Sequence, residues 1–251
     1  LALLNPIASE LTHMRRSLLP NIFQNILNNA RHLREFRFFE IGREIHPVPG
    51  KALPHESTHV VGVIFAVHAD EQEFFEWKRV VECLLPGAQL RAAESKIYEH
   101  PTRTAEILWR DAVVGLLFEL HPSLLQEAGL EGRADVFDID LDAAFSRPEP
   151  ATVYQPPRRY PTSGFDLSVI TGVKEPVSHL QDSLVQLAGP ALVSIEFVRQ
   201  YAGQPLEEGQ KSVSYHLEVG AADHTLTNEE VTEVRERIIE GMRTRGYDLR
   251  V

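Results

Sequence analysis

The sequence predicts an α+β fold made of two units. Its 251 residues exceed the usual size of one domain. A proline-rich stretch, 147–157, separates two segments of patterned sequence. Strand-like and helix-like runs follow one another without the regular βαβ alternation of a parallel sheet. We therefore assign 1–146 to a first domain, 147–157 to a linker and 158–251 to a second domain.

The first unit combines two helices with antiparallel strands. Residues 19–34 place Ile22, Ile26 and Leu33 on one helical stripe, and Pro20 is tolerated because it falls in the first turn. A second helix is expected at 70–85. Apolar, β-branched runs predict strands at 36–41, 59–67, 105–110, 112–120 and 134–141. Two of these strands are joined only by Arg110-Asp111, which predicts a hairpin.

The second unit has the order strand, helix, strand, strand, helix, strand. The expected elements are 165–171, 176–188, 192–201, 211–219, 227–244 and 247–251. Thr227 and Glu230 have the spacing of a capping box, and Leu226 with Val231 has that of a hydrophobic staple. This β-α-β-β-α-β order predicts a ferredoxin-like split βαβ sandwich.

The charge of the chain limits its partners. A formal net charge of −11 argues against non-specific nucleic-acid binding and excludes DNA from the expected partners. Residues 1–43 carry a balance of +3, whereas from Arg158 onward 10 Lys and Arg face 14 Asp and Glu. Any contact with RNA in the second unit therefore requires a local basic patch.

Other features of the composition favour a cytoplasmic protein. Cys83 is the single cysteine, so neither an intrachain disulfide nor a thiolate-rich zinc site is expected. No apolar run approaches the roughly 18–20 residues that span a bilayer, and the N-terminus has no basic n-region. The chain begins without Met and enters at once on patterned sequence, so we expect a piece of a longer protein.

Several motifs together resemble one family. The string NPIASELTHMRRSLLPNIFQNILNNARHLREFRFFEIGREI, residues 5–45, is similar to the segment of the bacterial phenylalanyl-tRNA synthetase β subunit that enters its class II synthetase-like core. Residues 115–145 resemble the last segment of that core, and their sequence is GLLFELHPSLLQEAGLEGRADVFDIDLDAAF. Several short motifs resemble the ferredoxin-fold anticodon-binding domain that ends this subunit. They are Tyr160-Pro161, Asp166, Tyr201-Ala202-Gly203, GQKS at 209–212 and HTLTNEEV at 224–231.

The resemblance implies a role in an α2β2 ligase that joins phenylalanine to tRNA-Phe with ATP and magnesium. It implies that catalysis belongs to the α subunit, that 1–146 is part of a non-catalytic antiparallel core, and that the last domain contacts tRNA near its anticodon. The family's editing domain and magnesium-ligand domain have no counterpart in these residues. The resemblance thus implies a carboxy-terminal fragment, which is expected to be inactive alone and to hold no cofactor.

The residues also predict a degenerate active site. Catalytic class II cores carry Phe-Arg-x-Glu on a strand, so that Arg and Glu lie on the same face. Here Arg37 and Glu40 are three residues apart and point to opposite faces. We expect one to be solvated and one to be in an internal or interface pair. Arg15, beside Arg16 at a helix entrance, is expected to be an interface or capping residue, with RNA or nucleotide contact as the alternative.

His55-Glu56-Ser57-Thr58-His59 matches the H-E-x-x-H motif of zinc hydrolases. That chemistry needs a helix, whereas these residues follow a proline-rich segment and run into a β-branched strand. In an extended chain the two histidines are roughly 13 Å apart, too far to share a zinc ion. The hydrolase is kept as a remote alternative to a polar loop that leads into an edge strand.

Asp138, Asp140 and Asp142 alternate at the end of a predicted strand and have the chemistry of a calcium or magnesium site. The simpler interpretation is a solvated strand face that ends in an Asp helix cap, with Asp140 starting a helical turn at 141–145. We adopt it and predict no metal site.

The candidate tRNA contacts lie on or beside the central strands and at the domain entrance. They are Arg158, Arg159, Arg199, Tyr201, Lys211 and Ser212. Aromatic rings stack on unpaired bases, and Lys and Arg meet phosphates. The alternative is that Tyr201 packs on the sheet and Lys211 is a solvated strand end. Where the family has two Arg before the Asp, this chain has Gly164 and Phe165, which implies a weaker or differently placed contact.

Two hypotheses therefore remain for the second unit, RNA binding and a purely structural role in assembly. RNA binding requires Arg199, Lys211 and the Arg158-Arg159 pair to converge on one surface, and assembly alone is favoured if they diverge. Assembly predicts a large exposed apolar patch on the first unit, because obligate interfaces resemble a core cut in half.

Overall fold

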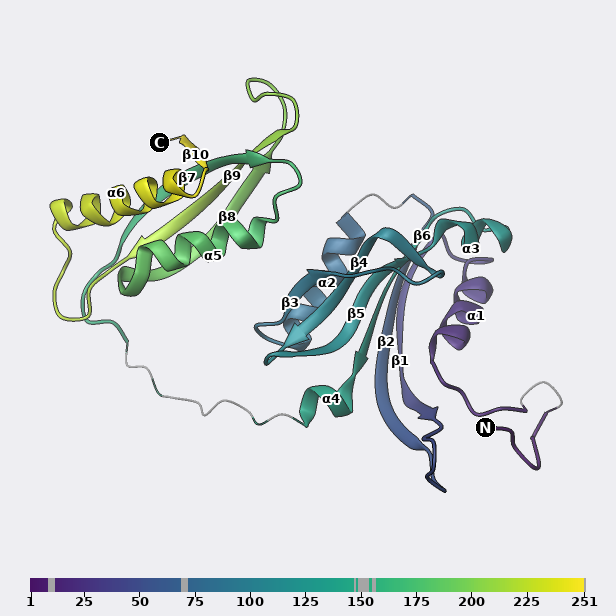
Figure 1. The fold of residues 1–251 in the computed structure, drawn as a ribbon. Coiled ribbons are helices and arrows are strands. Elements are labelled where there is room, and N and C mark those ends of the chain that lie inside the picture. The colour runs from purple at the N-terminus through teal and green to yellow at the C-terminus, as the bar shows by residue number, and fades with distance from the viewer. Residues whose placement is uncertain (9–11, 69–71, 147, 149–153, 155–156, 251) are drawn as a thin grey trace. The chain divides into compact units, whose positions relative to one another are not determined.

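The computed structural model describes residues 1–8, 12–68, 72–146, 148, 154 and 157–250. The chain divides into two compact units, Leu1–Ala151 and Thr152–Val251 (Figure 1). The fold is α+β with antiparallel strands throughout the named pairs, as expected. The predicted linker, 147–157, lies mostly outside the described residues, so the domain boundaries stay a prediction.

The first unit is one six-stranded sheet with helices on both faces. The strand order is β1-β2-β6-β5-β4-β3. The strands are β1 (Glu35–His46), β2 (His55–Ala66), β3 (Gln89–Ala92), β4 (Glu99–Trp109), β5 (Ala112–Leu120) and β6 (Arg133–Asp140). The helices are α1 (Leu19–Asn29), α2 (Gln72–Leu84), α3 (Pro122–Glu127) and α4 (Leu141–Phe145).

Side-chain alternation along β2 separates two cores. Val63 packs with Ile22 of α1, whereas its neighbour Ile64 packs with Trp77 of α2 on the other face. Successive residues of a strand point to opposite faces, so an unbroken apolar run in β2 serves both helices. The predicted hairpin between β4 and β5 is confirmed, and Arg110 and Asp111 have the positive φ angles, 50° and 62°, that a type I′ turn requires.

Several boundaries differ from those expected in the first unit. β1 continues to His46 and β2 begins at His55, because the two strands pair over their full length, from Glu35 with Ala66 to His46 with His55. The prediction of a polar loop at 55–58 was therefore wrong. β2 is also not an edge strand, since it lies between β1 and β6. α1 ends at Asn29 rather than at residue 34, because the chain turns where the amides of residues 32 and 33 bond to Asn29.

The second unit is the predicted ferredoxin-like sandwich. Its elements are β7 (Ser163–Gly172), α5 (Val177–Ala188), η1 (Gly189–Ala191), β8 (Leu192–Tyr201), β9 (Gln210–Val219), α6 (Asn228–Thr244) and β10 (Asp248–Arg250). The sheet order is β10-β7-β9-β8, which places the last strand beside the first. The capping box is confirmed: Glu230 N donates to Thr227 Oγ1 at 3.3 Å and Thr227 N donates to Glu230 Oε2 at 2.8 Å.

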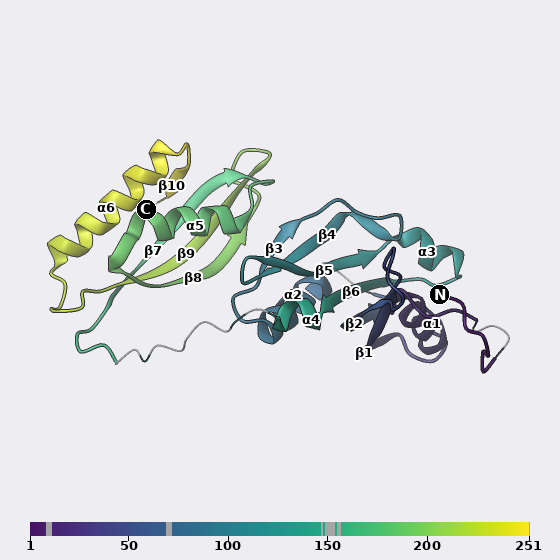
Figure 2. The ribbon, with the colours of Figure 1, turned by 60° about the horizontal axis from the view of Figure 1, so that its bottom comes forward.

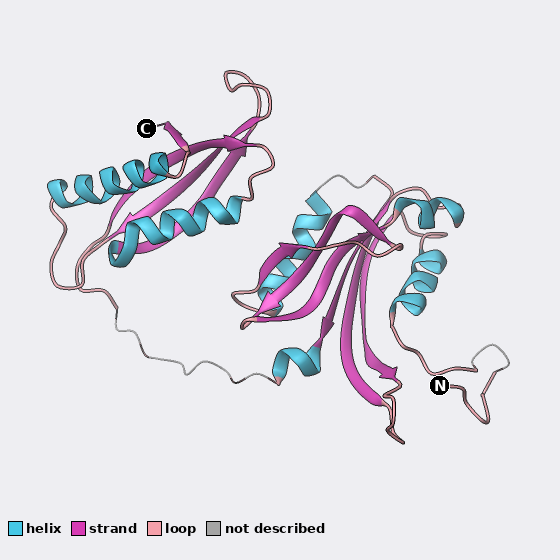
Figure 3. Ribbon diagram, viewed as in Figure 1, coloured by secondary structure: helices cyan, strands magenta, loops and turns pink. Residues whose placement is uncertain are grey.

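Both long helices of this unit cover the same face of its sheet (Figures 2 and 3). Leu184 of α5 and Ile238 of α6 pack with the odd-numbered residues of β9, such as Tyr215 and Leu217. The even-numbered residues of β9 point the opposite way. We call the face that they share with their cross-strand partners the open face.

Candidate nucleic-acid interface

Two rows of side chains form one end of the open face. The strand register places Arg250, Ser168, Ser214 and Arg199 side by side from β10 to β8. The second row is Asp248, Ile170, Ser212 and Tyr201. The hydroxyl groups of Ser168 and Ser214 are joined at 2.8 Å in the middle of the first row. The first row therefore has an arginine at each end and hydroxyl groups between them.

Tyr201 is the exposed aromatic residue of this end. The residue is 48% exposed, and its hydroxyl donates to the Gln204 carbonyl at 2.6 Å. The hydrogen bond ties the ring to the loop after β8. An exposed ring beside Arg199 has the chemistry to stack on an unpaired base while the guanidinium meets a phosphate.

The opposite end of the open face is acidic. His216 lies in one row with Asp166 and Glu196, and Glu218 follows in the next row. His216 Nδ1 lies 2.6 Å from Asp166 Oδ1, and this hydrogen bond is the main reason why the pKa of His216 is raised. The surrounding carboxylates repel phosphate. The arginines of the open face therefore lie at the end that carries Arg199 and Tyr201.

Lys211 does not belong to the open face. It is an odd-numbered residue of β9, it is 5% exposed, and burial lowers its pKa although the charge of Glu175 opposes this effect. It is thus not a solvated strand end, and its burial speaks against a direct contact with RNA. Alternation from Val213 and Tyr215 was the signal in the sequence that places Lys211 on the helix side.

Arg158 and Arg159 lie at the other end of the sheet. A Cβ at Gly220, which follows β9, would lie 3.2 Å from Arg158 Nη1. Along β9 this end is roughly 20–25 Å from Arg199 and Tyr201. The convergence required for RNA binding is therefore only partial: Arg199, Tyr201 and Ser212 lie together, and Arg250, which the sequence analysis missed, joins them.

The departure at Gly164 and Phe165 has a local cause. Gly164 lies on the open face, where a Cβ would be 2.8 Å from His216 Nε2. Phe165 packs against the core of the second unit, with the guanidinium of Arg235 6.0 Å from its ring centroid. An arginine at Gly164 would displace His216. The arginines of the open face, Arg199 and Arg250, lie at its other end.

In the first unit, Arg37 and Glu40 are paired on opposite sides of β1. Arg37 Nη2 lies 2.7 Å from Glu76 Oε2 of α2, and its side chain is still 52% exposed. Glu40 Oε1 accepts a hydrogen bond at 2.7 Å from Arg15 Nη1, and Arg15 Nε also donates to the Arg43 carbonyl. Both residues thus take part in internal ion pairs, and neither is merely solvated.

Exposed apolar side chains lie on the same face of β1 as Arg37. Phe39 is 68% exposed and Ile41 is 57% exposed, and β1 is an edge strand of the sheet. The surface of the first unit is therefore not uniformly polar. A pair of exposed apolar side chains on an edge strand is a feature that protein–protein interfaces cover.

The aspartates at the end of β6 have separate roles. Asp140 Oδ1 accepts a hydrogen bond from Ala143 N at 2.9 Å, so the predicted helix cap is confirmed. Asp142 Oδ2 accepts from Thr58 N at 2.8 Å. The prediction of a solvated strand face was wrong for Asp138, whose side chain is 17% exposed and whose Oδ1 lies 2.7 Å from His59 Nδ1.

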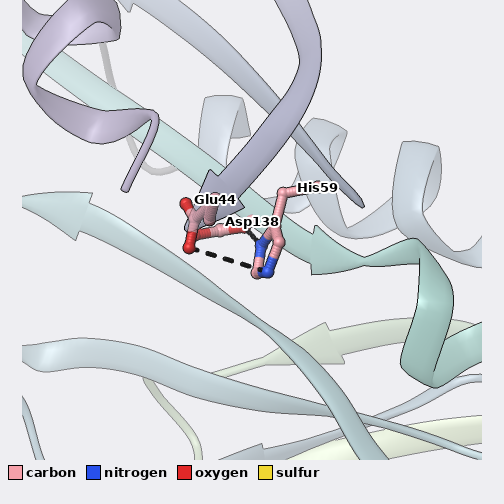
Figure 4. A group of neighbouring side chains, drawn as sticks. All are labelled: Glu44, His59 and Asp138. Atoms are coloured by element: carbon pink, nitrogen blue, oxygen red, sulfur yellow. Dashed lines mark hydrogen bonds and ion pairs between the residues drawn. The ribbon is translucent and has the colours of Figure 1, made fainter. Parts of the chain in front are cut away.

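His59 belongs to a cluster with Glu44 and Asp138 (Figure 4). Each of the three offers one ligand atom within 4.8 Å of the others. Burial lowers the pKa of His59, but the hydrogen bond to Asp138 and the charges of Glu44 and Asp140 outweigh it, so the pKa is raised. His55 and His59 both lie in β2, so the H-E-x-x-H string does not have the helical geometry of a zinc hydrolase.

Among the described residues, none of the helices is both long and apolar enough to cross a membrane.

Comparisons with known proteins agree on one family. Residues 1–141 match the Phenylalanyl tRNA synthetase beta chain CLM domain, and residues 158–250 match the Ferredoxin-fold anticodon binding domain. A phenylalanine–tRNA ligase beta subunit of Solibacter usitatus is 48% identical over 98% of this chain, and that of Symbiobacterium thermophilum is 32% identical over 100% of it.

The chain spans about a third of these relatives, 32% and 30% of their respective lengths. Among solved structures, Desulfitobacterium hafniense PylSc, a pyrrolysyl tRNA synthetase, is 17% identical over 52% of this chain and 48% of its own, with a TM-score of 0.42. The two matched domains and the identities to the relatives show that this chain belongs to the phenylalanyl-tRNA synthetase beta chain family.

Proposed function

We propose that this chain is the carboxy-terminal part of a phenylalanine–tRNA ligase beta subunit, which contributes subunit assembly and tRNA-Phe binding to aminoacylation. The single observation that carries the proposal is the end of the open face with Arg199, Tyr201, Ser212 and Arg250, in the domain that matches the anticodon-binding family. It combines an exposed ring, hydroxyl groups and two cations, which suit unpaired bases and phosphates.

The chemistry of the ligase belongs, in this proposal, to the α subunit of a cytoplasmic α2β2 enzyme, together with ATP and magnesium. The pairing of Arg37 with Glu76 and of Glu40 with Arg15 supports this division, because it directs the two groups to opposite sides of β1. Neither group is then available to a nucleotide on a common face. We therefore expect the chain alone to form no aminoacyl adenylate.

A salt titration with unmodified tRNA-Phe transcript and an unrelated tRNA tests the RNA contact. Arg199→Ala and Arg250→Ala are each expected to weaken binding and to reduce the slope of log affinity against log salt by about one. Arg243→Ala is the matched control, since it removes the same charge from α6, on the opposite side of the sheet. Tyr201→Leu is expected to cost about 1–3 kcal/mol of binding free energy, because it removes one stacking platform.

The outcomes separate RNA binding from assembly alone. Preferential binding of tRNA-Phe that responds to Arg199 and Arg250 but not to Arg243 supports the proposal. Equal losses in all three variants would indicate only a general charge effect. Absence of binding to either tRNA by the whole chain would reject a tRNA contact by this chain alone and leave the assembly role.

The assembly role is tested with the α subunit. Phe39 and Ile41 lie two residues apart on one face of an edge strand, so a partner sheet or helix can cover both. Phe39→Arg is expected to weaken association at least tenfold, measured by light scattering of mixed subunits. Ile97→Arg is the control, because Ile97 is 93% exposed and lies outside the strands of this sheet. Equal association of both variants would reject this face as the contact.

A further inference from the structure

One row of the open face carries two unpaired cations and two hydroxyl groups. Arg250 and Arg199 stand at its ends, and Ser168 and Ser214 stand at its centre. Both arginines are exposed, and neither has an ion-pair or hydrogen-bond partner among the residues that the structure describes. The row contains no carboxylate, although the next row toward the acidic end contains Asp166. Its charge therefore suits an anion that reaches across the strands.

A β-bulge at Val198 directs Arg199 onto this row. Phe197 lies opposite Tyr215 on the helix side of the sheet, where the centroids of the two rings are 6.2 Å apart. The next paired residue, Arg199, lies opposite Ser214, so Val198 is an extra residue in β8. Regular alternation from Phe197 would return Arg199 to the helix side. The bulge therefore re-aims the end of β8 and places Arg199 on the open face.

The separation of the two arginines suits phosphates that are not neighbours. Arg250 lies on β10 and Arg199 on β8, and the sheet order places β7 and β9 between these strands. With strands roughly 4.8 Å apart, the two Cα atoms are roughly 14 Å apart. Neighbouring phosphates of one nucleic-acid strand are closer together than this. A strand whose phosphates meet both guanidinium groups therefore crosses the sheet with at least one nucleotide over the serines.

The serine pair offers both a donor and acceptors to that nucleotide. Ser168 Oγ and Ser214 Oγ lie 2.8 Å apart, so one hydroxyl donates to the other. Each hydroxyl has one hydrogen and two lone pairs, so the pair keeps one hydrogen and three lone pairs for a ligand. A phosphate oxygen only accepts, whereas a ribose 2′-hydroxyl both donates and accepts. The pair thus has the chemistry to bind a ribose.

The next row places an aromatic ring beside the serines. Tyr201 lies two residues beyond Arg199 on β8, roughly 7 Å along the strand. A nucleotide whose base stacks on Tyr201 has its sugar and phosphates within reach of the row that ends at Arg199. Base, sugar and phosphate can then each meet a group of matching chemistry.

We propose that Ser168 and Ser214 bind the 2′-hydroxyl of a single-stranded RNA segment that crosses the strands, with its phosphates on Arg199 and Arg250. The inference rests on the proposed tRNA contact and adds a preference for ribose over deoxyribose. Arginines meet the phosphates of RNA and DNA alike, so this preference comes from the uncharged pair at the centre of the row. Ser168 and Ser214 are thus specificity-determining residues.

The test uses the whole 251-residue chain and two versions of the tRNA-Phe anticodon hairpin. Both versions have an RNA stem, and their loop nucleotides carry either ribose or 2′-deoxyribose. Fluorescence anisotropy at several salt concentrations measures the two affinities. We expect the ribose loop to bind about three- to tenfold more tightly, which is the effect of one hydrogen bond. The slopes of log affinity against log salt are expected to be equal, because the two loops carry the same phosphates.

Replacing both serines, Ser168→Ala together with Ser214→Ala, is expected to remove the preference and to keep the salt slope, because no charge changes. Removing both partners of a hydrogen bond is nearly neutral for stability, and circular dichroism checks the fold. Ser214→Thr keeps the hydroxyl and is expected to retain the preference. Ser194→Ala is the matched control, because the Ser194 hydroxyl donates to Glu218 at the acidic end of the same face.

The outcomes separate this inference from the proposed tRNA contact. Loss of the preference in the double alanine variant, with its retention in Ser194→Ala and Ser214→Thr, would support the inference. Equal affinity for the two hairpins, with a salt slope that falls in Arg199→Ala, would overturn it and leave the tRNA contact in place. A preference that survives in the double alanine variant would also overturn it. Absence of binding to either hairpin would overturn both proposals.

Discussion

At the scale of single residues, Asp135 is a group whose ionisation folding alters strongly. It lies on β6, is 3% exposed, and its Oδ1 has no hydrogen-bond partner among the described residues. Burial, followed by the nearby charges of Glu119 and Glu73, raises its pKa to about 8. Its carboxyl group is therefore protonated in the folded chain and ionised in the unfolded chain over a wide range of neutral pH.

The sign of the resulting pH dependence is opposite to that of a salt-bridged aspartate. Between about pH 4 and pH 8 the folded state binds a proton that the unfolded state has released, so stability falls as pH rises. We predict that Asp135→Asn removes most of this fall, which amounts to roughly a few kcal/mol. Tryptophan fluorescence during urea unfolding at several pH values measures the stability of the first unit, because both Trp77 and Trp109 belong to that unit.

Asp111→Asn is the matched control, since it makes the same chemical change at an exposed hairpin turn. It is expected to keep the pH dependence of the unsubstituted chain. An Asp135→Asn variant whose stability still falls between pH 5 and pH 8 by the original amount would contradict the assignment.

Side-chain direction was predictable for some residues and not for others. Alternation with Val213 and Tyr215 places Lys211 under the helices, and the sequence contains that signal. The position of Arg250 depends on how a three-residue edge strand pairs with β7, and no periodicity specifies that register. The cluster around Glu44 and His59 joins residues from three strands, so no local motif indicates it.

At the scale of elements, the start of α6 is defined by side chains. Thr227 and Glu230 satisfy each other's backbone amides, and the side chain of Glu230 also lies 3.0 Å from His224 Nε2. Both backbone donors would lose protein partners if the box were broken. This box was recognisable in the sequence because its spacing is fixed and its residue types are few.

We predict that Thr227→Ala destabilises the first turn of α6 by about 1 kcal/mol. Amide hydrogen exchange of residues 228–231 measures this local change. Thr232→Ala is the control within the same helix, because its hydroxyl donates to the Asn228 carbonyl rather than capping the helix, and alanine has the higher helix propensity. If the two variants exchange alike, the capping box contributes nothing to the helix.

Short elements without such markers were not predicted. β3 has four residues, Gln89–Ala92, and exists because it pairs with 105–108 of β4. α3 has six residues and begins where His121 Nδ1 accepts a hydrogen bond from Ser123 N, a cap that histidine seldom provides. These short elements form because of tertiary strand pairing and an unusual cap, which the local sequence does not indicate. The long elements were predictable from their hydrophobic periodicity and their turn residues.

At the scale of the whole molecule, each unit contains its own core. The core cluster of the second unit is drawn entirely from residues 165–249, with buried side chains from both helices and from β7 and β9. A unit of this size with a helix layer over a four-stranded sheet buries enough apolar surface to fold independently. The fold class and the two-unit organisation were therefore accessible from the sequence, because each unit has its own complete pattern.

We predict that residues 158–251 fold without the rest of the chain and unfold cooperatively at the same midpoint as this unit does in the whole chain. Leu217→Ala should lower both midpoints equally, since Leu217 is fully buried and its truncation costs about 2–5 kcal/mol. Val198→Ala is the control, because Val198 is 51% exposed on β8. Circular dichroism of both chains in urea measures these effects. A lower midpoint in the isolated unit would mean that the first unit contributes to the stability of the second. An equal effect of Leu217→Ala in both chains would show that the core of the second unit is intact in the isolated unit.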